Sequence, residues 1–191
     1  MDQISDEDLM LRVQQGGDHD AFSELFRRYR ARITSYVCRL VGEVAEGENL
    51  AQETFLRLLE KRDLYTYPRR LSTWLFTIAR NLTTDFQKKK RAMTSEAFDL
   101  IADAQRESDS RRPDAAGMQR EATQALQEAI GRLQTTHREV LILRSFHEMS
   151  YREIAEVVGC PESTARSRMD YALKELKAYY RKLNREKGGI S

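Results

Sequence analysis

Four small polar and charged residues near the C-terminus have the spacing of one helix face, namely Ser163, Arg166, Ser167 and Asp170. Steps of three, one and three residues bring side chains together on one side of a helix. An arginine can donate two hydrogen bonds to a guanine edge or hold a phosphate, and a carboxylate can accept one from a cytosine amino group. The face is therefore suited to reading a DNA duplex. The sequence leaves open whether Arg166 contacts a base or a phosphate.

The residues around this face predict how it is presented. Ser150, followed by Glu153 three positions later, has the pattern of a capping box, which satisfies two free backbone donors at a helix start. Gly159 suits the left-handed position that ends that helix, and Pro161 suits the start of the next one. The second helix is expected to bury one apolar row, made of Ala165, Met169, Leu173 and Leu176. Residues 150–176 are thus predicted to form a helix-turn-helix, which inserts its second helix into the major groove.

A second candidate surface combines aromatic and basic residues. Residues 61–91 contain nine basic and two acidic side chains, and a loop at 62–70 precedes a helix predicted from Leu71 to about Arg91. Aromatic rings can stack on unpaired bases while cationic side chains follow the phosphates, as single-stranded nucleic acid requires. The candidate residues are Tyr65, Thr66, Tyr67, Arg69, Arg70, Arg80, Asn81 and Lys88.

A plainer interpretation of this segment stays open from the residues alone. The tyrosines could cover a hydrophobic core, and the basic run could solvate a helix end, where the macrodipole favours positive charge. Trp74 falls within the apolar stripe of the predicted helix, so we expect it to pack in the core rather than stack on a base.

The helix predicted near Glu46 to Lys61 has one apolar face and one mixed face. The mixed face carries Asn49, Gln52, Glu53, Leu56 and Arg57. Most such faces are simply solvated. The order of the elements makes this one notable, because the aromatic and basic loop, an acidic segment and the helix-turn-helix follow it in the chain.

The fold class expected from the whole chain is all-α, with two small helical domains joined by a flexible acidic linker and a helix-turn-helix in the second. Residues 92–118 contain six acids and three bases and have low hydrophobicity, which is typical of an extended linker. Thr136 and Glu139 suggest a second capping box at the start of a helix. The expected division is 1–92 for the first domain, 93–118 for the linker, 119–185 for the second domain and 186–191 for a tail. In the first domain we expect helices at 6–15, 20–41, 46–61 and 71–91, and in the second the first helix is expected at 119–133.

Composition excludes several classes of protein. The 191 residues include 32 basic and 30 acidic side chains, and this balance alone predicts nothing. His19, His137 and His147 lie on unrelated predicted helices, and a phosphate loop and a Ser/His/Asp set are missing, so we expect no enzyme activity, no metal and no cofactor. Cys38 and Cys160 are expected to be small buried hydrophobes. Apolar runs fall far short of a membrane span, and the acidic N-terminus is unlike a signal peptide, so we expect a cytoplasmic protein.

Five strings in order carry a resemblance to a known family. They are AFSELFRRY, ENLAQETFLRL, STWLFTIARN, REVLILRSF and SYREIAEVVGCPESTARSR. In these strings the chain resembles the extracytoplasmic-function group of bacterial RNA polymerase sigma factors, which belongs to the sigma-70 family. The resemblance extends over about four fifths of the chain, and the order and spacing of the strings make it specific.

The resemblance implies an alternative sigma factor that binds core RNA polymerase and directs promoter recognition and transcription initiation without catalysis of its own. Its expected protein partners are the clamp helices of the beta-prime subunit, the beta flap and an anti-sigma factor, through which it could be held at the membrane. The clamp helices would be bound by Asn49, Gln52, Glu53 and Arg57. The family usually has an aspartate where this chain has Asn49.

The DNA-binding residues are also implied by the resemblance. In the minus-10 element, a flipped base would be captured by Tyr65, Thr66 and Tyr67, with Arg69, Arg70, Arg80, Asn81 and Lys88 along the DNA backbone. In the minus-35 element the implied contacts are Arg144, Ser163, Arg166, Ser167, Asp170 and Tyr171. Asp170 departs from the aromatic or basic residues common at its position. The alternative function, a stand-alone helix-turn-helix regulator with a helical sensor domain, leaves the basic aromatic segment unexplained.

Overall fold

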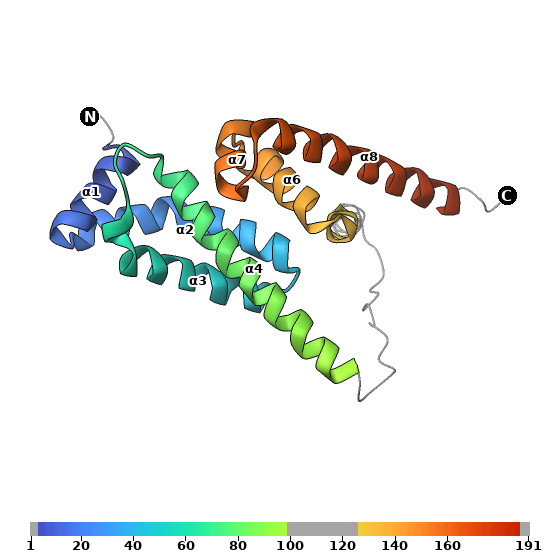
Figure 1. The fold of residues 1–191 in the computed structure, drawn as a ribbon, viewed down its shortest axis with the longest axis horizontal. Helices are drawn as coiled ribbons and strands as arrows, with labels where there is room; N and C mark the ends of the chain where they lie inside the picture. The colour runs from blue at the N-terminus through green and yellow to red at the C-terminus, as the bar shows by residue number, and fades with distance from the viewer. Residues whose placement is uncertain (1–3, 99–125, 188–191) are drawn as a thin grey trace, which may run out of the picture.

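The computed structural model describes residues 4–98 and 126–187, and within these ranges the regular structure is entirely helical (Figure 1). The all-α prediction is therefore confirmed. The predictions for residues 1–3, for 99–118 of the expected linker, for 119–125 and for residues 188–191 of the tail lie outside the described residues. The elements are α1 (Asp6–Gly16), α2 (His19–Val41), α3 (Val44–Glu60), the short 3-10 helix η1 (Arg62–Leu64), α4 (Leu71–Phe98), a helical stretch at 126–132, α6 (Thr135–His147), α7 (Tyr151–Val158) and α8 (Glu162–Lys187).

Helices α1 to α4 form the first group, with α2 packed against each of the other three. Asp18 caps the start of α2 by accepting hydrogen bonds from the backbone N–H groups of Asp20 and Ala21, both at 3.0 Å. Gly42, with a φ of 81°, ends the helix in the left-handed conformation, as expected for a C-terminal glycine. The apolar residues of α2 recur at helical spacing and are buried or partly buried along its length.

Helices α2 and α3 approach closely at Gly47. A Cβ atom added to this buried glycine would lie 2.8 Å from the Cα atom of Cys38, closer than two carbons can approach without a shift. Cys38 itself is half-buried, as is Cys160, so both are less buried than expected. Cys38 is next to Gly47, and burial there raises the pKa of its thiol.

Helix α4 continues seven residues beyond its predicted end at Arg91, to Phe98. These residues, AMTSEAF, include good helix formers and neither glycine nor proline, so helix propensity favours continuing the helix. The first part of the expected linker is therefore helical. Trp74 is 8% exposed and packs against Tyr65 with 5.4 Å between ring centroids, which confirms its predicted place in the core.

Helices α6 to α8 form the second group. The capping box at Ser150 is present, since the Ser150 side chain accepts from the Glu153 backbone and the Glu153 carboxylate accepts from the Ser150 N–H at 2.8 Å. Gly159 ends α7 with a φ of 66°. The buried row of α8 is corrected: Leu173 is 49% exposed, and Ala172 is buried in its place. Two successive steps of four residues would turn Leu173 about 80° away from Ala165, so the step after Met169 is three residues and reaches Ala172.

The predicted capping box at Thr136 and Glu139 is wrong. Helix α6 begins at Thr135, and its N-cap residue, Gln134, makes no side-chain capping bond. Glu139 is 3% exposed, and its carboxylate faces Arg80 of α4 instead. Its place is thus set by the packing of the two groups and not by the helix start.

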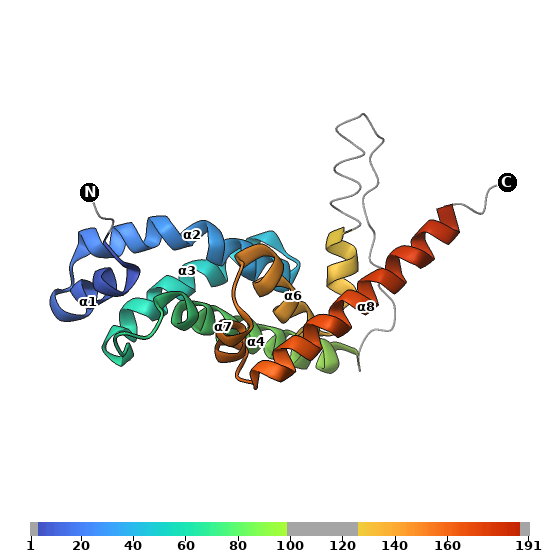
Figure 2. The ribbon, with the colours of Figure 1, turned by 90° about the horizontal axis from the view of Figure 1, so that it is seen from above.

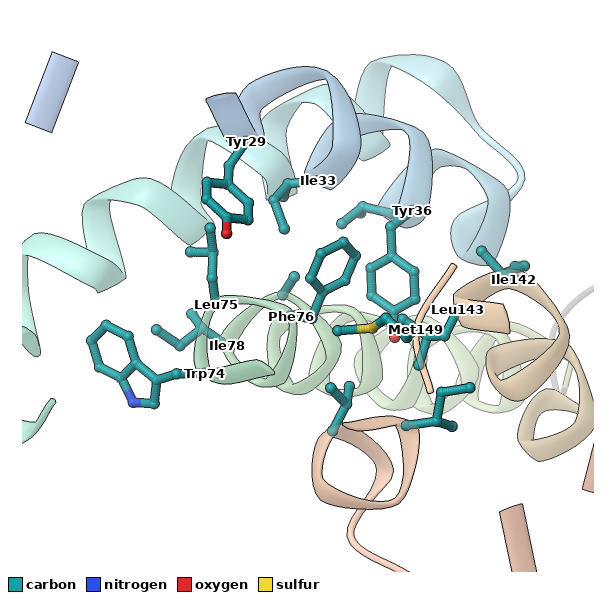
Figure 3. Close-up of a cluster of buried hydrophobic side chains, with 14 of the residues drawn as sticks. Tyr29, Ile33, Tyr36, Trp74, Leu75, Phe76, Ile78, Ile142, Leu143 and Met149 are labelled. Atoms are coloured by element: carbon teal, nitrogen blue, oxygen red, sulfur yellow. The ribbon is translucent and has the colours of Figure 1, made fainter. Parts of the chain in front are cut away.

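The two groups pack against each other through α2 and α4 on one side and α6 and α7 on the other (Figure 2). Tyr36 and Phe76 of the first group meet Leu143 and Met149 of the second, and all four are buried (Figure 3). The described part of the molecule therefore has one continuous hydrophobic core that crosses from the first group to the second.

Candidate nucleic-acid and polymerase interfaces

The predicted base-reading face lies on the first half of α8 and is exposed at Ser163, Arg166, Ser167 and Asp170. The Ser167 hydroxyl donates to the Ser163 carbonyl at 2.9 Å, and Arg166 pairs with Glu162 at 2.5 Å. Both interactions lie on the exposed surface of one helix. These side chains can exchange their present partners for DNA groups without any change in the core.

Two predicted DNA-binding arginines meet at Tyr151. The guanidinium carbon of Arg166 lies 4.6 Å from the centroid of the Tyr151 ring, and that of Arg144 lies 5.2 Å from it. Arg144 also donates to the Met149 carbonyl at 2.9 Å. Tyr151 thus brings together cationic groups from α6 and α8, within the range in which cations interact with aromatic rings. Its role was not predicted, because Tyr151 looks locally like the first residue after the N-cap.

Tyr171 is 55% exposed at the end of the base-reading face. Its ring stacks on that of His137 with 5.6 Å between centroids and an interplanar angle of 13°. His137 in turn lies 2.6 Å from the Glu175 carboxylate. One ring face of Tyr171 is therefore covered by α6, and the exposed remainder can contact DNA.

The predicted base-capture loop divides into buried and exposed residues. Tyr65 is 3% exposed, its hydroxyl donates to the Arg69 carbonyl, and burial raises the pKa of its hydroxyl to about 12. Thr66 is exposed and Tyr67 is 50% exposed. Of the three predicted capture residues, the structure leaves only Thr66 and Tyr67 available at the surface, while Tyr65 anchors the loop to the core.

The predicted backbone track of the first group also has two kinds of residue. Arg69, Asn81 and Lys88 are exposed. Arg70 and Arg80 pair with carboxylates of the second group: Arg70, whose side chain stays 70% exposed, with Glu153 at 2.7 Å, and Arg80, which is 24% exposed, with Glu139 at 3.2 Å.

The predicted polymerase-binding face of α3 is on the surface. Asn49 and Gln52 are exposed, and Leu56 is 55% exposed. Arg57 forms ion pairs with Glu53 at 2.9 Å and with Glu60 at 2.8 Å along the same helix. The face therefore presents an apolar side chain beside a row of fixed charges.

The interface between the two groups, called the seam below, is formed by α2 and α4 on one side and α6 and α7 on the other. Three of its buried residues were not predicted as interface residues from the sequence: Phe76, Glu139 and His147. The His147 ring lies 5.0 Å from the Phe76 ring and 5.9 Å from the Tyr36 ring, measured between centroids. Burial, with a smaller contribution from nearby arginines, lowers the pKa of His147 to about 4. Burial raises the pKa of Glu139, against the opposing effect of Arg80. The interface between the groups therefore contains an imidazole that is hard to protonate and a carboxylate that burial makes harder to ionise.

Residues 4–98 and 126–187 contain no group of three or more histidine, cysteine, aspartate or glutamate side chains placed to hold a metal ion. Over the same ranges no helix has the length and apolar character needed to cross a membrane.

Comparisons with known proteins agree on a family. Residues 25–93 match the model of sigma-70 region 2, and residues 123–176 match that of sigma-70 region 4. The ECF RNA polymerase sigma factor SigW of Bacillus subtilis is 32% identical over 173 residues, which are 87% of this chain and 92% of that protein. The ECF RNA polymerase sigma factor RpoE of Cereibacter sphaeroides is 30% identical, over 90% of this chain and 92% of that protein.

The fold is also shared with a solved structure, that of CnrH in complex with the cytosolic domain of CnrY. The TM-score is 0.69 at 22% identity, over 91% of this chain and 95% of that one. This likeness concerns the fold alone. The sequence matches show that the chain belongs to the extracytoplasmic-function group of sigma-70 factors, the subunits that direct RNA polymerase to promoters.

Proposed function

We propose that the two helical groups divide promoter recognition between them, the first holding polymerase and the minus-10 element and the second reading the minus-35 duplex. The observation that carries this proposal is the exposed row on α8, from Ser163 to Asp170, which follows a turn fixed by the capping box and by Gly159. A rigid turn presents the row at a defined angle, as groove reading requires.

In the second group, Arg166 is the candidate for a bidentate contact to guanine, and Arg144 is the candidate for a neighbouring phosphate. Asp170 would be repelled by phosphates, so its useful partner is the amino group of a cytosine. Ser163, Ser167 and Tyr171 complete the surface with groups that can contact bases or backbone.

In the first group, the exposed Thr66 and Tyr67 are the candidates for holding an extruded base of the minus-10 element. Extrusion costs a few kcal/mol, which pocket contacts and stacking must offset. Tyr65 anchors the loop that carries these two residues to the core, since its ring packs on Trp74 and its backbone carbonyl accepts from the Gln14 side chain at 3.0 Å. The backbone track would be formed by Arg69, Arg70, Arg80, Asn81 and Lys88.

The mixed face of α3 is the candidate contact for the clamp helices of the beta-prime subunit. Gln52 and Leu56 are free to pack against a partner helix, and Glu53 and Arg57 offer fixed charges. Asn49 keeps the hydrogen-bonding shape of the aspartate usual in the family but lacks its charge. The second group is the candidate contact for the beta flap. The proposed domain limits are 1–92 and 119–185.

We also propose a protein that carries no catalytic activity or cofactor and is held inactive in the cytoplasm by an anti-sigma factor. CnrH has been solved with the cytosolic domain of CnrY, and a sigma factor RpoE of Bartonella quintana with the anti-sigma factor NepR. Both share the fold of this chain at about the same extent. A membrane would be reached only through such a partner.

Run-off transcription with purified core polymerase and a genomic promoter library tests the proposed function. We expect transcripts only when the sigma factor is added, and we expect Arg166→Ala to reduce those from promoters with a distinct minus-35 element. Arg152→Ala is the matched control, because Arg152 is an exposed arginine of the same domain outside the base-reading face. Absence of initiation at every promoter would overturn the proposal. Tight binding to a duplex without polymerase would favour the stand-alone regulator.

A further inference from the structure

Helix α1 holds the loop between α3 and α4 at two points (Figure 1). The Gln14 side chain donates hydrogen bonds to the carbonyl of Tyr65 at 3.0 Å and to that of Asp63 at 3.4 Å. The Glu7 carboxylate accepts a hydrogen bond from the backbone N–H of Leu71 at 3.1 Å. Both side chains of α1 are half-buried. The two contacts therefore bracket the segment that lies between Tyr65 and Leu71.

The contact of Glu7 replaces a cap that the local sequence does not supply. The residue immediately before α4 is Arg70, and an arginine side chain has no acceptor, whereas Ser, Thr, Asp and Asn are the usual N-cap residues. The Glu7 carboxylate provides the missing acceptor from another helix, and its negative charge is favoured at a helix N-terminus. The start of α4, which is also the end of the loop, is thus set by α1.

Helix α1 is itself fixed to the first group, so it can serve as a support. Its Asp6 carboxylate accepts hydrogen bonds from the Arg28 guanidinium at 2.6 Å and from the Tyr29 hydroxyl, both on α2. Three of its residues are buried in the core: Leu9, Met10 and Val13. A loop attached to a helix that is packed in this way has a defined position relative to α2 and α4.

Short-range bonds connect the two held points to the proposed base-capture residues. The Tyr65 hydroxyl donates to the Arg69 carbonyl, and the Arg69 N–H donates to the Thr66 carbonyl at 2.9 Å. These bonds close the segment into a turn, and Thr66 and Tyr67 are exposed on it. A displacement at either end of the turn therefore moves both capture residues. Binding sites lose selectivity when their groups shift by as little as about 0.5 Å.

We infer that Gln14 and Glu7 are positioning residues for base selection in the minus-10 element, acting through the loop and not by contact with DNA. Helix α1 lies outside residues 25–93, which match sigma-70 region 2. The inference rests on the proposed capture role of Thr66 and Tyr67. If the two contacts served only to stabilise the fold, their loss would weaken all promoter contacts alike and would not change the choice of one base.

The test variant is Gln14→Met/Glu7→Met, which removes the donor and the acceptor while keeping long side chains. The matched control is Gln15→Met/Asp8→Met, which changes an amide and a carboxylate that are exposed on the same helix. The contacts described for Asp8 are with Ser5 at the start of α1. A conservative variant, Glu7→Gln, keeps an oxygen that can accept from the start of α4 and should behave like the original protein.

Each variant is assembled with core polymerase and assayed on a promoter found in the run-off library, with every minus-10 base replaced in turn by the other three. We expect the Gln14/Glu7 variant to lose discrimination at one minus-10 position by about fivefold or more, as the loss of two hydrogen bonds allows. Discrimination at the minus-35 element should stay within about twofold, because that surface belongs to the second group. Unchanged discrimination at every minus-10 position, or equal losses at both elements, would overturn the inference.

Fluorescence of Trp74 gives a second readout that needs no DNA. It is the only tryptophan of the chain, and its ring packs against that of Tyr65, so its accessibility to acrylamide reports the position of the loop. Quenching should be stronger in the Gln14/Glu7 variant than in the control variant, at equal helix content by circular dichroism. Equal quenching in the two variants would contradict a loop held by α1.

A further variant separates this inference from the proposed function. Thr66→Ala/Tyr67→Ala is assayed on the same promoter set in the holoenzyme and should lose discrimination at the position that responds to the Gln14/Glu7 variant. Full discrimination in Thr66→Ala/Tyr67→Ala would refute the capture role and the inference with it. A loss there without any effect of the Gln14/Glu7 variant would refute the inference alone.

Discussion

Two pairs of arginines lie on the surfaces proposed to contact DNA, and they are held in different ways. Arg70 and Arg80 of the first group are paired with carboxylates of the second. Arg144 and Arg166 of the second group interact only within it, at the Tyr151 ring, the Met149 carbonyl and Glu162. Packing of the two groups therefore engages two arginines of the minus-10 side, Arg80 at 24% exposure and Arg70 at 70%, and leaves the minus-35 side formed and exposed. The minus-10 surface and the minus-35 surface should therefore respond differently to any change that separates the two groups.

The largest effect is expected from Phe76→Ala. The Phe76 ring is fully buried between α2, α4 and the second group and packs on Tyr36 with 5.2 Å between centroids. Removing a buried phenyl ring costs about 3 to 5 kcal/mol through lost burial and the cavity left behind. Urea unfolding of the free protein would measure this loss, with binding of minus-35 duplex as the second readout.

The affinity of folded Phe76→Ala for minus-35 duplex should stay within about twofold of that of the original protein. The contacts described for Arg144 and Arg166 are with other residues. Leu173→Ala is a suitable control, because Leu173 is an exposed apolar residue and its removal should cost less than about 0.5 kcal/mol. Equal losses for the two variants would contradict the burial of Phe76.

The next largest effect is expected from Arg166→Ala, on the exposed minus-35 surface. A bidentate contact to a base edge contributes about 1 to 3 kcal/mol of discrimination, whereas a single phosphate contact weakens binding to all sequences alike. Titration of the protein with its minus-35 duplex and with a mutated duplex distinguishes the two roles that the sequence left open. Binding to a single-stranded 20-mer should not change, and a parallel loss there would show that the two surfaces are not independent.

The seam should also respond to pH through His147. In the closed form its pKa is about 4, and on opening it returns to its ordinary value of 6.5. The open form therefore binds the extra proton, so closure is weakened as the pH falls below 6.5, by about 1 kcal/mol at pH 5.5. The radius of gyration should accordingly rise between pH 7.5 and 5.5.

Other charged and titratable groups lie near His147, so a control variant is needed to assign the pH response. Arg32 and Arg39 of α2 lower its pKa, and the hollow beside it is also lined by Asp6, Glu7, Arg70, Glu148 and Glu153. Glu139 acts in the opposite direction, because its raised pKa means that the closed form takes up a proton more readily as the pH falls. His147→Gln should therefore abolish or reverse the response to pH. An expansion of the same size in that variant would assign the effect to another group.

Local signals in the sequence were enough to predict the frame of the second group. The capping residues Ser150 and Glu153 and the left-handed Gly159 act through neighbouring backbone groups, so their pattern is readable without the fold. The same pattern misled at Thr136 and Glu139, because the Glu139 carboxylate has a better partner in Arg80, 59 positions earlier in the chain. A pairing between residues so far apart in the sequence produces no periodic pattern of residue types from which it could be predicted.

The candidate sites were predicted where they face solvent and missed where the groups meet. Phe76 lies off the apolar row that contains Trp74, because its neighbours at helical spacing, Thr73 and Arg80, are polar. That mixed second face was the available signal, since a helix with two occupied faces packs against two partners. Tyr65 shows the converse, because its residue type suits base stacking but its ring packs on Trp74.

The smallest effect is expected at Tyr151, whose ring contacts two arginines of the exposed minus-35 surface. A cation over an aromatic ring contributes about 0.5 to 1 kcal/mol at an exposed site, so Tyr151→Leu should weaken minus-35 duplex binding by several-fold as Arg144 and Arg166 lose their shared support. Tyr151→Phe keeps the ring and should bind within about twofold of the original protein, unless the hydroxyl itself contacts DNA, in which case both variants weaken alike. The decisive measurement is the double variant Tyr151→Leu/Arg166→Ala: if the ring acts by positioning Arg166, its removal must cost less once that arginine is gone, and fully additive losses would contradict the coupling.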